Sequence, residues 1–185
     1  MNDNVENLIA ELQKISDESQ NKFGNLSAGQ LNWKPNAKSW SIGQCFDHLI
    51  VTNESEFPEI EKVARGKHQN PFWGKVPFLT DFWGRFVLKA VEPDNTKKTK
   101  NPKVFSPSSS DVDANIIDRF VEHQQKAIEL MKRTKNLDLT KIIISSPVAP
   151  FVTYRLSDTY KIVVQHEKRH FKQAERVLQA EGFPK

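Results

Sequence analysis

The sequence predicts an all-α protein, a bundle of four long helices with long crossover connections. Apolar residues recur three and four positions apart in four separate segments, which is the period of an amphipathic helix. The alternating pattern of a half-buried strand is scarce. A length of 185 residues and a hydrophobic content of 37% suit one ordinary globular domain. We therefore expect a single domain over residues 1–185, with its functional site between facing helices.

The first half of the chain contains three of the expected helices. The first covers about residues 4–23 and ends at Gly24. After a connection, Ser41 and Gln44 form the pattern of a capping box, which opens the second helix. Pro58 is expected to kink or end this helix locally before its apolar pattern resumes. A shorter helix is expected over about residues 77–91.

The second half begins with a polar loop over residues 92–111, after which Asp111 is expected to cap another long helix. Residues 136–155 contain two prolines and several β-branched residues, so we expect an extended crossing with room for a short strand. Ser157 is then expected to cap the last helix, which ends near Gly182.

Composition narrows the function classes. The single cysteine, Cys45, excludes a disulfide framework and fits a reducing compartment, so we expect a cytoplasmic protein. The most apolar stretch, residues 72–91, is interrupted by four charged side chains and is not expected to span a membrane. The formal charge of +4 is too mixed to indicate a nucleic-acid surface. Lysines 97, 98, 100 and 103 are therefore interpreted as part of a solvated loop.

The histidines carry the main chemical signal. His166 and His170 lie four residues apart in the last helix, so both rings share one face and can converge on one ion. The same stripe contains Thr159, Val163 and Ala174, which indicates that the face points into the bundle. Two buried imidazoles need partners for their nitrogens, and a cation supplies them. The alternative is a pair of core histidines bonded to backbone or carboxylate groups.

The segment also has the His-Glu-x-x-His form of a metalloprotease helix, with Glu167 as a candidate general base. The downstream ligand that such enzymes need is lacking, because Gln173 and Arg176 stand where the elongated motif has Gly and His. The third ligand is therefore expected upstream. His48 and His123 both lie on expected helices, and periodicity slightly favours His123, but the pattern does not choose between them.

At this point the sequence resembles the DinB-like (YfiT-type) superfamily of metal-binding four-helix bundles. The residues that carry the resemblance are Leu26-Ser27, Gln30 to Pro35, Ser39 to Gln44, His48-Leu49, and the late pair His166 and His170 followed by Gln173. The resemblance implies that His48, His166 and His170 hold the metal, in preference to His123. It also implies an up-down-down-up bundle, frequently dimeric and often occupied by zinc or nickel.

The resemblance further implies a reaction, since the best-understood relatives activate a low-molecular-weight thiol such as bacillithiol, mycothiol or glutathione for transfer to an electrophile. We expect such an enzyme, or one that activates water; the alternative is a noncatalytic metal- or ligand-binding stress-response bundle. The expected partners are a small thiol, an electrophile and a second copy of the chain, with neither nucleic acid nor a membrane. Three neutral imidazoles suit this chemistry because they leave coordination positions open.

Other residues near the expected site are candidates for supporting roles. We interpret Glu167 as an exposed charge that pairs with Lys168 or Arg169, in preference to a general base. Cys45 is interpreted as a buried core residue and not as a rival nucleophile. Candidates for hydrogen bonding to the ligand imidazoles are Gln44, Asp47 and Thr159. Candidates for pocket walls are Trp33, Trp40, Trp73, Trp83 and the Lys103 to Phe105 segment.

Overall fold

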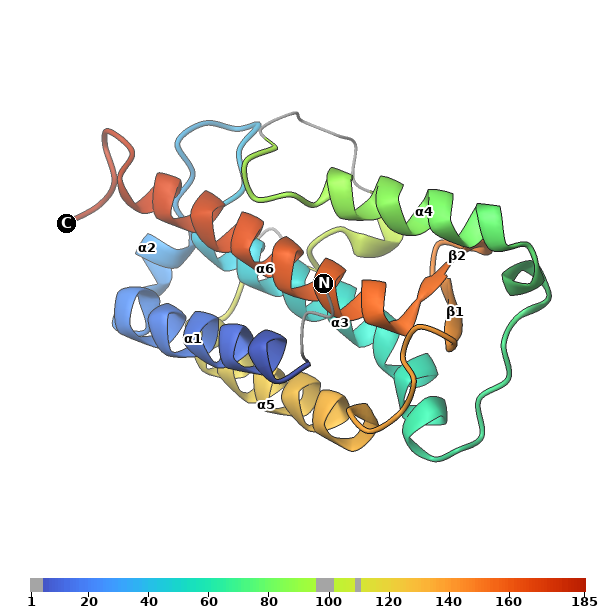
Figure 1. Ribbon diagram of the computed structural model, residues 1–185. Coiled ribbons are helices and arrows are strands. Elements are labelled where there is room, and N and C mark those ends of the chain that lie inside the picture. Colours follow the sequence, from blue (N-terminus) through green and yellow to red (C-terminus); the bar gives the residue numbers. More distant parts are fainter. Residues whose placement is uncertain (1–4, 96–101, 109–110) are drawn as a thin grey trace.

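The computed structural model describes residues 5–95, 102–108 and 111–185 (Figure 1). Its described part is mostly helical and contains one two-stranded antiparallel sheet, so the all-α prediction holds for most of these residues. The elements are α1 (Val5–Phe23), α2 (Ala28–Asn32), α3 (Ile42–Ala64), η1 (Phe72–Lys75), α4 (Pro77–Ala90), η2 (Lys103–Phe105), α5 (Ile116–Thr134), β1 (Ile143–Ser146), β2 (Ala149–Arg155) and α6 (Leu156–Leu178).

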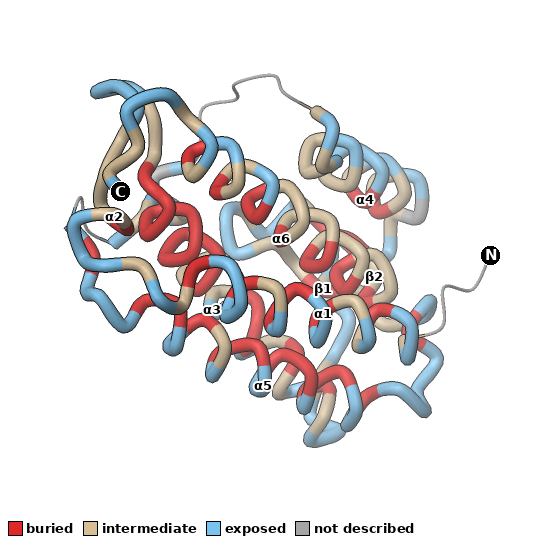
Figure 2. The backbone as a smooth tube through the Cα atoms, turned by 90° about the vertical axis from the view of Figure 1, so that its left-hand side faces the viewer, coloured by how far each residue is buried: buried red, intermediate tan, exposed pale blue. Residues whose placement is uncertain are grey.

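The four longest helices pack on one another. Helices α1 and α3 each contact both α5 and α6. Their buried sides face inward, as the burial colouring of Figure 2 shows. Phe46 and Phe120 fill one part of the core and Leu12 and Tyr160 another, all nearly inaccessible to solvent. Complete burial of such a side chain stabilises the fold by roughly 1.5–3 kcal/mol. Helix α4 lies outside this set and packs against β2 and α6 (Figure 1).

Helix α3 begins as the sequence predicts and continues past Pro58, where the sequence left open a kink or a local end. The Ser41 side chain accepts a hydrogen bond from the backbone of Gln44, whose side chain accepts one from the backbone of Ser41. Pro58 lies inside the helix, which runs on to Ala64 and does not end there. A proline inside a helix removes one backbone hydrogen bond and its ring crowds the preceding turn, at a combined cost of about 3 kcal/mol. Burial of Phe57, Ile60 and neighbouring apolar residues offsets this cost.

Two predicted helix starts are wrong. Asn115 and not Asp111 occupies the N-cap position of α5, and its side chain makes no capping hydrogen bond. The helix starts later because the Asn32 amide holds the backbone of Val112: Val112 N donates to it at 2.9 Å and the Val112 carbonyl accepts from it at 2.8 Å. Arg155 occupies the N-cap position of α6, because β2 runs directly into this helix. Ser157, the expected cap, lies inside the helix and donates its backbone N–H to the Leu139 carbonyl.

The expected extended crossing is a β-hairpin. Strands β1 and β2 pair with Ile144 opposite Tyr154, and the register shifts after Ser145. Ile144 and Tyr154 are both buried in the core that α3 and α6 also line. The hairpin therefore closes one end of the helical core and leads into α6.

Gly43 permits a close contact at the start of α3. A Cβ at this position would lie 2.1 Å from Cγ2 of Val112 and 3.2 Å from the Leu31 carbonyl oxygen. We therefore expect Gly43→Ala to lower the free energy of unfolding by about 1–3 kcal/mol through overpacking, measured by urea denaturation. Gly29→Ala is the matched control, because the nearest atom to its Cβ is 4.0 Å away and no loss is expected. Equal stability of the two variants would contradict the prediction.

Candidate metal centre

Three histidines meet between α3 and α6. His48 comes from α3, and His166 and His170 come from successive turns of α6. One ring nitrogen of each lies within 4.8 Å of the corresponding nitrogens of the other two. Three imidazoles bound to one zinc ion place their ligand nitrogens about 3.4 Å apart. The structure thus brings together the three residues that the resemblance implies.

A backbone carbonyl fixes the tautomer of His48. The Nδ1 atom of His48 lies against the carbonyl oxygen of Phe105, and a carbonyl only accepts, so Nδ1 carries the proton. The Nε2 atom therefore presents a lone pair, and it lies 3.1 Å from Nε2 of His166. Metal-bound histidines commonly donate their other ring nitrogen to a carbonyl in this way. His48 is thus oriented as a ligand.

Burial keeps the cluster uncharged. It lowers the pKa of His48 to about 4, although the Phe105 carbonyl opposes the shift. The pKa values of His166 and His170 are held well below 6.5, first by burial and then by neighbouring positive charge. Neutral imidazoles are the form that binds metal. The three residues therefore fit a divalent cation in donor type and charge.

An orphaned nitrogen also agrees with a cation. His170 is 8% exposed, and its Nδ1 atom is buried without a hydrogen-bond partner among the described residues. A buried polar atom of this kind is costly unless something binds nearby. Trp40 covers the same ring, stacked at 5.5 Å between centroids, and its ring is 4.9 Å from that of His48. Trp40 thus forms one wall of the centre.

Asp47 holds the loop that orients His48. Its carboxylate accepts a hydrogen bond from the backbone N–H of Ser108 at 2.5 Å and from the Ser108 hydroxyl at 2.8 Å. Ser108 follows Phe105 by three residues, so Asp47 fixes the segment whose carbonyl contacts His48. Asp47, one of the residues suggested from helical phase, acts through the loop. Of the other two, Gln44 takes part in the capping box, and Thr159 donates to the Arg155 carbonyl at 3.1 Å.

We expect Asp47→Ala to weaken metal binding about tenfold, the lower end of the effect of losing an outer partner of a ligand. The physical reason is that the released loop no longer holds the Phe105 carbonyl against His48. The measurement is metal affinity by competition with a chromogenic chelator, with circular dichroism to confirm the helical content. Asp113→Ala, an exposed carboxylate of the same segment, is the control. Matching affinities for the two variants would refute this role.

Glu167 is buried, which corrects the expectation of an exposed charge. Its residue is 0% exposed, and its two carboxylate oxygens accept hydrogen bonds from Asn53 at 2.7 Å and Gln124 at 2.5 Å. The two amides come from α3 and α5, and their hydrogen bonds make the burial of the carboxylate possible. Burial raises the pKa of Glu167 to about 7, against the two amide hydrogen bonds. These contacts tie α6 to both neighbours, and we assign Glu167 a structural role.

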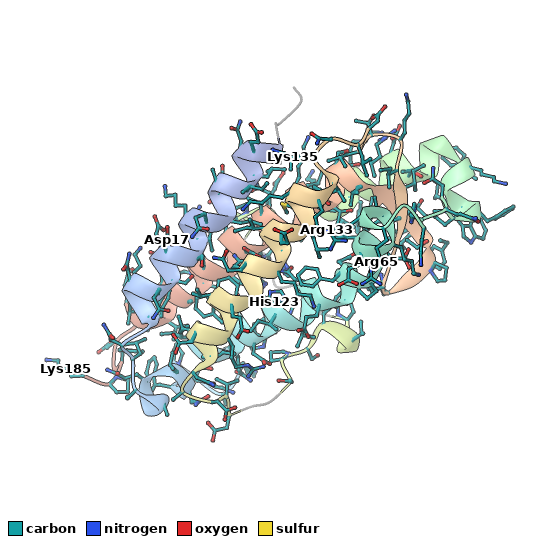
Figure 3. The ribbon with its side chains drawn as sticks, turned by 90° about the horizontal axis from the view of Figure 1, so that it is seen from below. Asp17, Arg65, His123, Arg133, Lys135 and Lys185 are labelled. Carbon is teal, nitrogen blue, oxygen red and sulfur yellow. The ribbon has the colours of Figure 1, made fainter. Side chains whose placement is uncertain are left out.

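His123 lies apart from the cluster, although periodicity favoured it as a ligand. It is on α5 (Figure 3). Its ring stacks on that of Phe57, with the centroids 4.9 Å apart and an angle of 15° between the planes. His123 is 7% exposed, and burial lowers its pKa to about 4. Neither of its ring nitrogens has a hydrogen-bond partner among the described residues. His123 is therefore a buried residue of α5 that lies outside the cluster.

The remaining candidates lie elsewhere. Cys45 is buried as expected, and burial raises the pKa of its thiol to about 12. Trp33 packs against Phe183, while Trp73 belongs to η1 and Trp83 to α4. Lysines 97, 98 and 100 lie outside the described residues, and the side chain of Lys103 is likewise not described. Within the described ranges, no helix combines the length and apolar character needed to cross a membrane.

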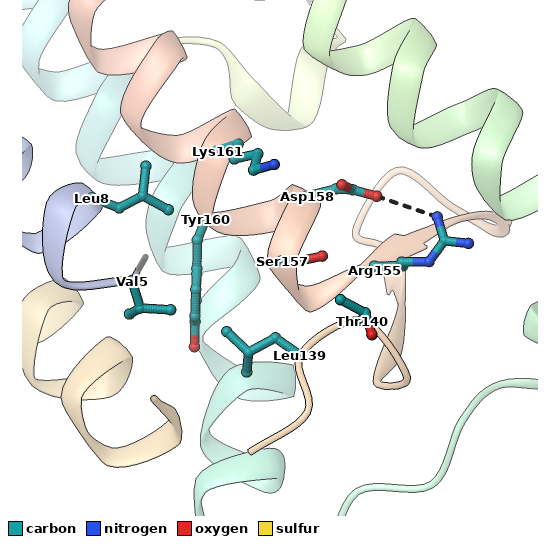
Figure 4. Close-up of a pocket in the computed structure, with 9 residues that line it drawn as sticks. All are labelled: Val5, Leu8, Leu139, Thr140, Arg155, Ser157, Asp158, Tyr160 and Lys161. Atoms are coloured by element: carbon teal, nitrogen blue, oxygen red, sulfur yellow. Dashed lines mark ion pairs between the residues drawn. The ribbon is translucent and has the colours of Figure 1, made fainter. Parts of the chain in front are cut away.

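A cavity of about 300 Å³ lies at the beginning of α6, away from the histidines (Figure 4). Its polar side includes Arg155 and Asp158, which form an ion pair at 3.9 Å. None of the three clustered histidines lines it. The candidate metal centre is therefore defined by its ligands and not by this cavity.

A mostly helical fold with three converging imidazoles between two long helices defines a class of helical proteins with a candidate metal site in the core. A sequence model of the DinB superfamily matches residues 11–174. The chain therefore belongs to the DinB superfamily. Neither the curated proteins nor the solved structures include a significant match to this chain.

Proposed function

We propose that this protein is a metal-dependent enzyme in which His48, His166 and His170 hold zinc or nickel. Its substrate is a low-molecular-weight thiol, transferred to an electrophile, or water in a hydrolytic reaction. The observation that carries the proposal is the convergence of three imidazoles in a group that, among the described residues, contains no carboxylate or thiolate ligand. Three neutral ligands leave the divalent charge unbalanced and coordination positions open.

The chemistry that a bound metal supplies is a lowered pKa for a thiol or water at an open position, giving a nucleophile near neutral pH. The chain's own residues supply the setting. The Phe105 carbonyl holds the proton on Nδ1 of His48 and so directs Nε2 inward. Trp40 shields two of the imidazoles from water. Arg169 provides a nearby positive charge, which favours an anionic substrate group.

A noncatalytic metal- or ligand-binding bundle is the second candidate. The observation that favours it is the burial of two of the three ligands, since His48 is 2% and His170 8% exposed, while His166 is half-buried. A site this closed suits a structural or sensing metal as well as a reacting one. The two candidates share the histidines and differ in whether a thiol reacts.

The deciding experiment incubates metal-loaded protein with bacillithiol, mycothiol or glutathione and 1-chloro-2,4-dinitrobenzene as a generic electrophile. A rate above that of buffer which disappears in His166→Ala supports the enzyme. Cys45→Ala is the control, because the only cysteine is buried and its loss should leave the rate unchanged. Rates equal to buffer with all three thiols, from protein that holds its metal, would favour the noncatalytic bundle.

We propose the following setting for this activity. The protein is a cytoplasmic homodimer, and α1, α3, α5 and α6 form a four-helix bundle of up-down-down-up topology. The contacts of α1 and α3 with both α5 and α6 support the bundle. The cytoplasmic location rests on the single, free cysteine, which fits a reducing compartment, and the dimer and the helix order rest on the resemblance to the family.

A further inference from the structure

Helix α4 turns its small residues toward the rest of the protein. Thr80 and Gly84 are buried, and the Thr80 hydroxyl is 3.0 Å from the hydroxyl of Thr153 in β2. A Cβ on Gly84 would lie 2.9 Å from Oδ2 of Asp158 and 3.7 Å from Cβ of Tyr154. Close packing on β2 and α6 therefore uses the narrow side of α4 and leaves its large side chains on the opposite side.

That opposite side is aromatic and exposed. Phe78, Phe82 and Phe86 follow one another at intervals of four residues and are 74%, 53% and 56% exposed. Together with Phe72 and Trp73 of the adjacent η1, these rings expose on the order of 600 Å². This is at the upper end of the largest apolar patches on soluble monomers, and patches of that size mark interaction sites.

The charges on this side are positive. Arg85 and Lys89 are exposed on the same side of α4 as the three phenylalanines, and Lys75 precedes the helix, with Nζ 5.9 Å from the centre of the Phe72 ring. The carboxylate at the border, Asp81, is paired with Arg155. We call Phe78, Phe82, Arg85, Phe86 and Lys89 the α4 face; it presents aromatic rings and cations together.

We infer that the α4 face binds the surface of an anionic phospholipid bilayer. Helices that lie in the bilayer interface insert phenylalanine at the level of the headgroups, and nearby Lys and Arg are attracted to anionic lipids. Helix α4 is placed for such contact, because it lies along the outer edge of the molecule (Figure 1). A second copy seated on this face would bring the Arg85 and Lys89 side chains of both copies into one interface, where these like charges repel.

The sequence led us to expect no membrane partner because it contains no spanning segment. Contact with the surface of a bilayer requires no such segment. The inference is also independent of the metal centre, because none of the three histidines belongs to the α4 face.

The test is co-sedimentation of the full protein with vesicles of phosphatidylcholine alone and of phosphatidylcholine with phosphatidylglycerol, about two to one. We expect partitioning to the mixed vesicles only, decreasing as salt is raised. Loss of one cation should lower the affinity for the mixed vesicles about fivefold. The double variant Arg85→Gln and Lys89→Gln should therefore bind roughly 25-fold more weakly than wild type. Phe78→Ser, Phe82→Ser and Phe86→Ser combined should abolish it, since each buried ring contributes tenfold or more.

The control for the phenylalanines is Leu137→Ser, which alters another exposed apolar side chain. The control for the cations is the double variant Lys14→Gln and Lys132→Gln, on α1 and α5. Each control protein should bind the mixed vesicles as wild type does. Circular dichroism and metal content should be unchanged in every variant, because the altered side chains are exposed. Failure of wild type to sediment with the mixed vesicles would overturn the inference. So would sedimentation velocity showing a dimer that the triple phenylalanine variant converts to monomer, because the face would then be an interface between copies.

Discussion

Replacement of His48, His166 or His170 by alanine is expected to remove the bound metal. Wild-type protein purified without a histidine tag should carry near one equivalent of a divalent ion, and each variant should bind at least about 100-fold more weakly. Loss of an outer partner already costs 10–100-fold, so loss of a ligand should cost more. Metal content by mass spectrometry, followed by chelator competition, measures the effect. The three ring nitrogens lie within 4.8 Å of one another, so all three can bind the same ion and each variant removes one of its ligands.

His123→Ala is the matched control, because this histidine is equally buried but stacks on Phe57 outside the cluster. We expect it to retain its metal. An essential His123 with a dispensable His48 would show that the ligand assignment is wrong while a metal site exists. Folded wild type that takes up no divalent ion, even when supplied, would reject the metal centre and with it the proposed function.

Helices could be predicted from the sequence where local patterns determine them. The Ser41 and Gln44 capping box forms as its spacing predicts, and α1 ends at Phe23, directly before Gly24. The same signal could have identified α2, since Ser27 and Gln30 form a second capping box within the expected connection. The starts of α5 and α6 could not be read locally, because distant contacts hold Val112 and Ser157.

The metal centre likewise has one part that local sequence patterns predict and another that depends on distant contacts. The spacing of His166 and His170 on one helix face predicts their proximity, whereas the position of His48 beside them depends on how α3 packs against α6. Periodicity therefore could not separate His48 from His123, because both lie on buried helix faces. The Phe105 carbonyl and the amides around Glu167 had no signal in the sequence, since each comes from a segment more than 40 residues away.

A buried carboxylate at a distance from the histidines predicts how stability depends on pH. Glu56 of α3 is 9% exposed; Tyr154 donates its hydroxyl to Oε1 at 2.7 Å, and Oε2 is buried without a partner among the described residues. Burial raises the pKa of Glu56 from 4.5 to about 7, although the Tyr154 hydrogen bond opposes the shift. The folded protein thus holds this proton more tightly than the unfolded chain does.

The sign follows from proton linkage. Below pH 4.5 both states are protonated and Glu56 carries no penalty, whereas above pH 7 its buried charge lowers the free energy of unfolding. Between these two limits, the shift in the pKa of Glu56 lowers the free energy of unfolding by about 3 kcal/mol. We therefore expect the stability of Glu56→Gln, relative to wild type, to increase by that amount between pH 4.5 and pH 8, because glutamine does not ionise. Urea unfolding across this range measures it.

The relative measurement isolates Glu56 from the other buried groups. Glu167, with its pKa also near 7, and His48 and His123, with pKa values near 4, are present in both proteins, so their contributions cancel in the difference. Glu54→Gln, an exposed position on the same helix, is the matched control for the substitution itself. Tyr154→Phe removes the hydrogen bond that opposes the shift and should extend the loss of stability to higher pH. A Glu56→Gln difference that does not change with pH would show that this carboxylate ionises in the folded protein as easily as in the unfolded chain.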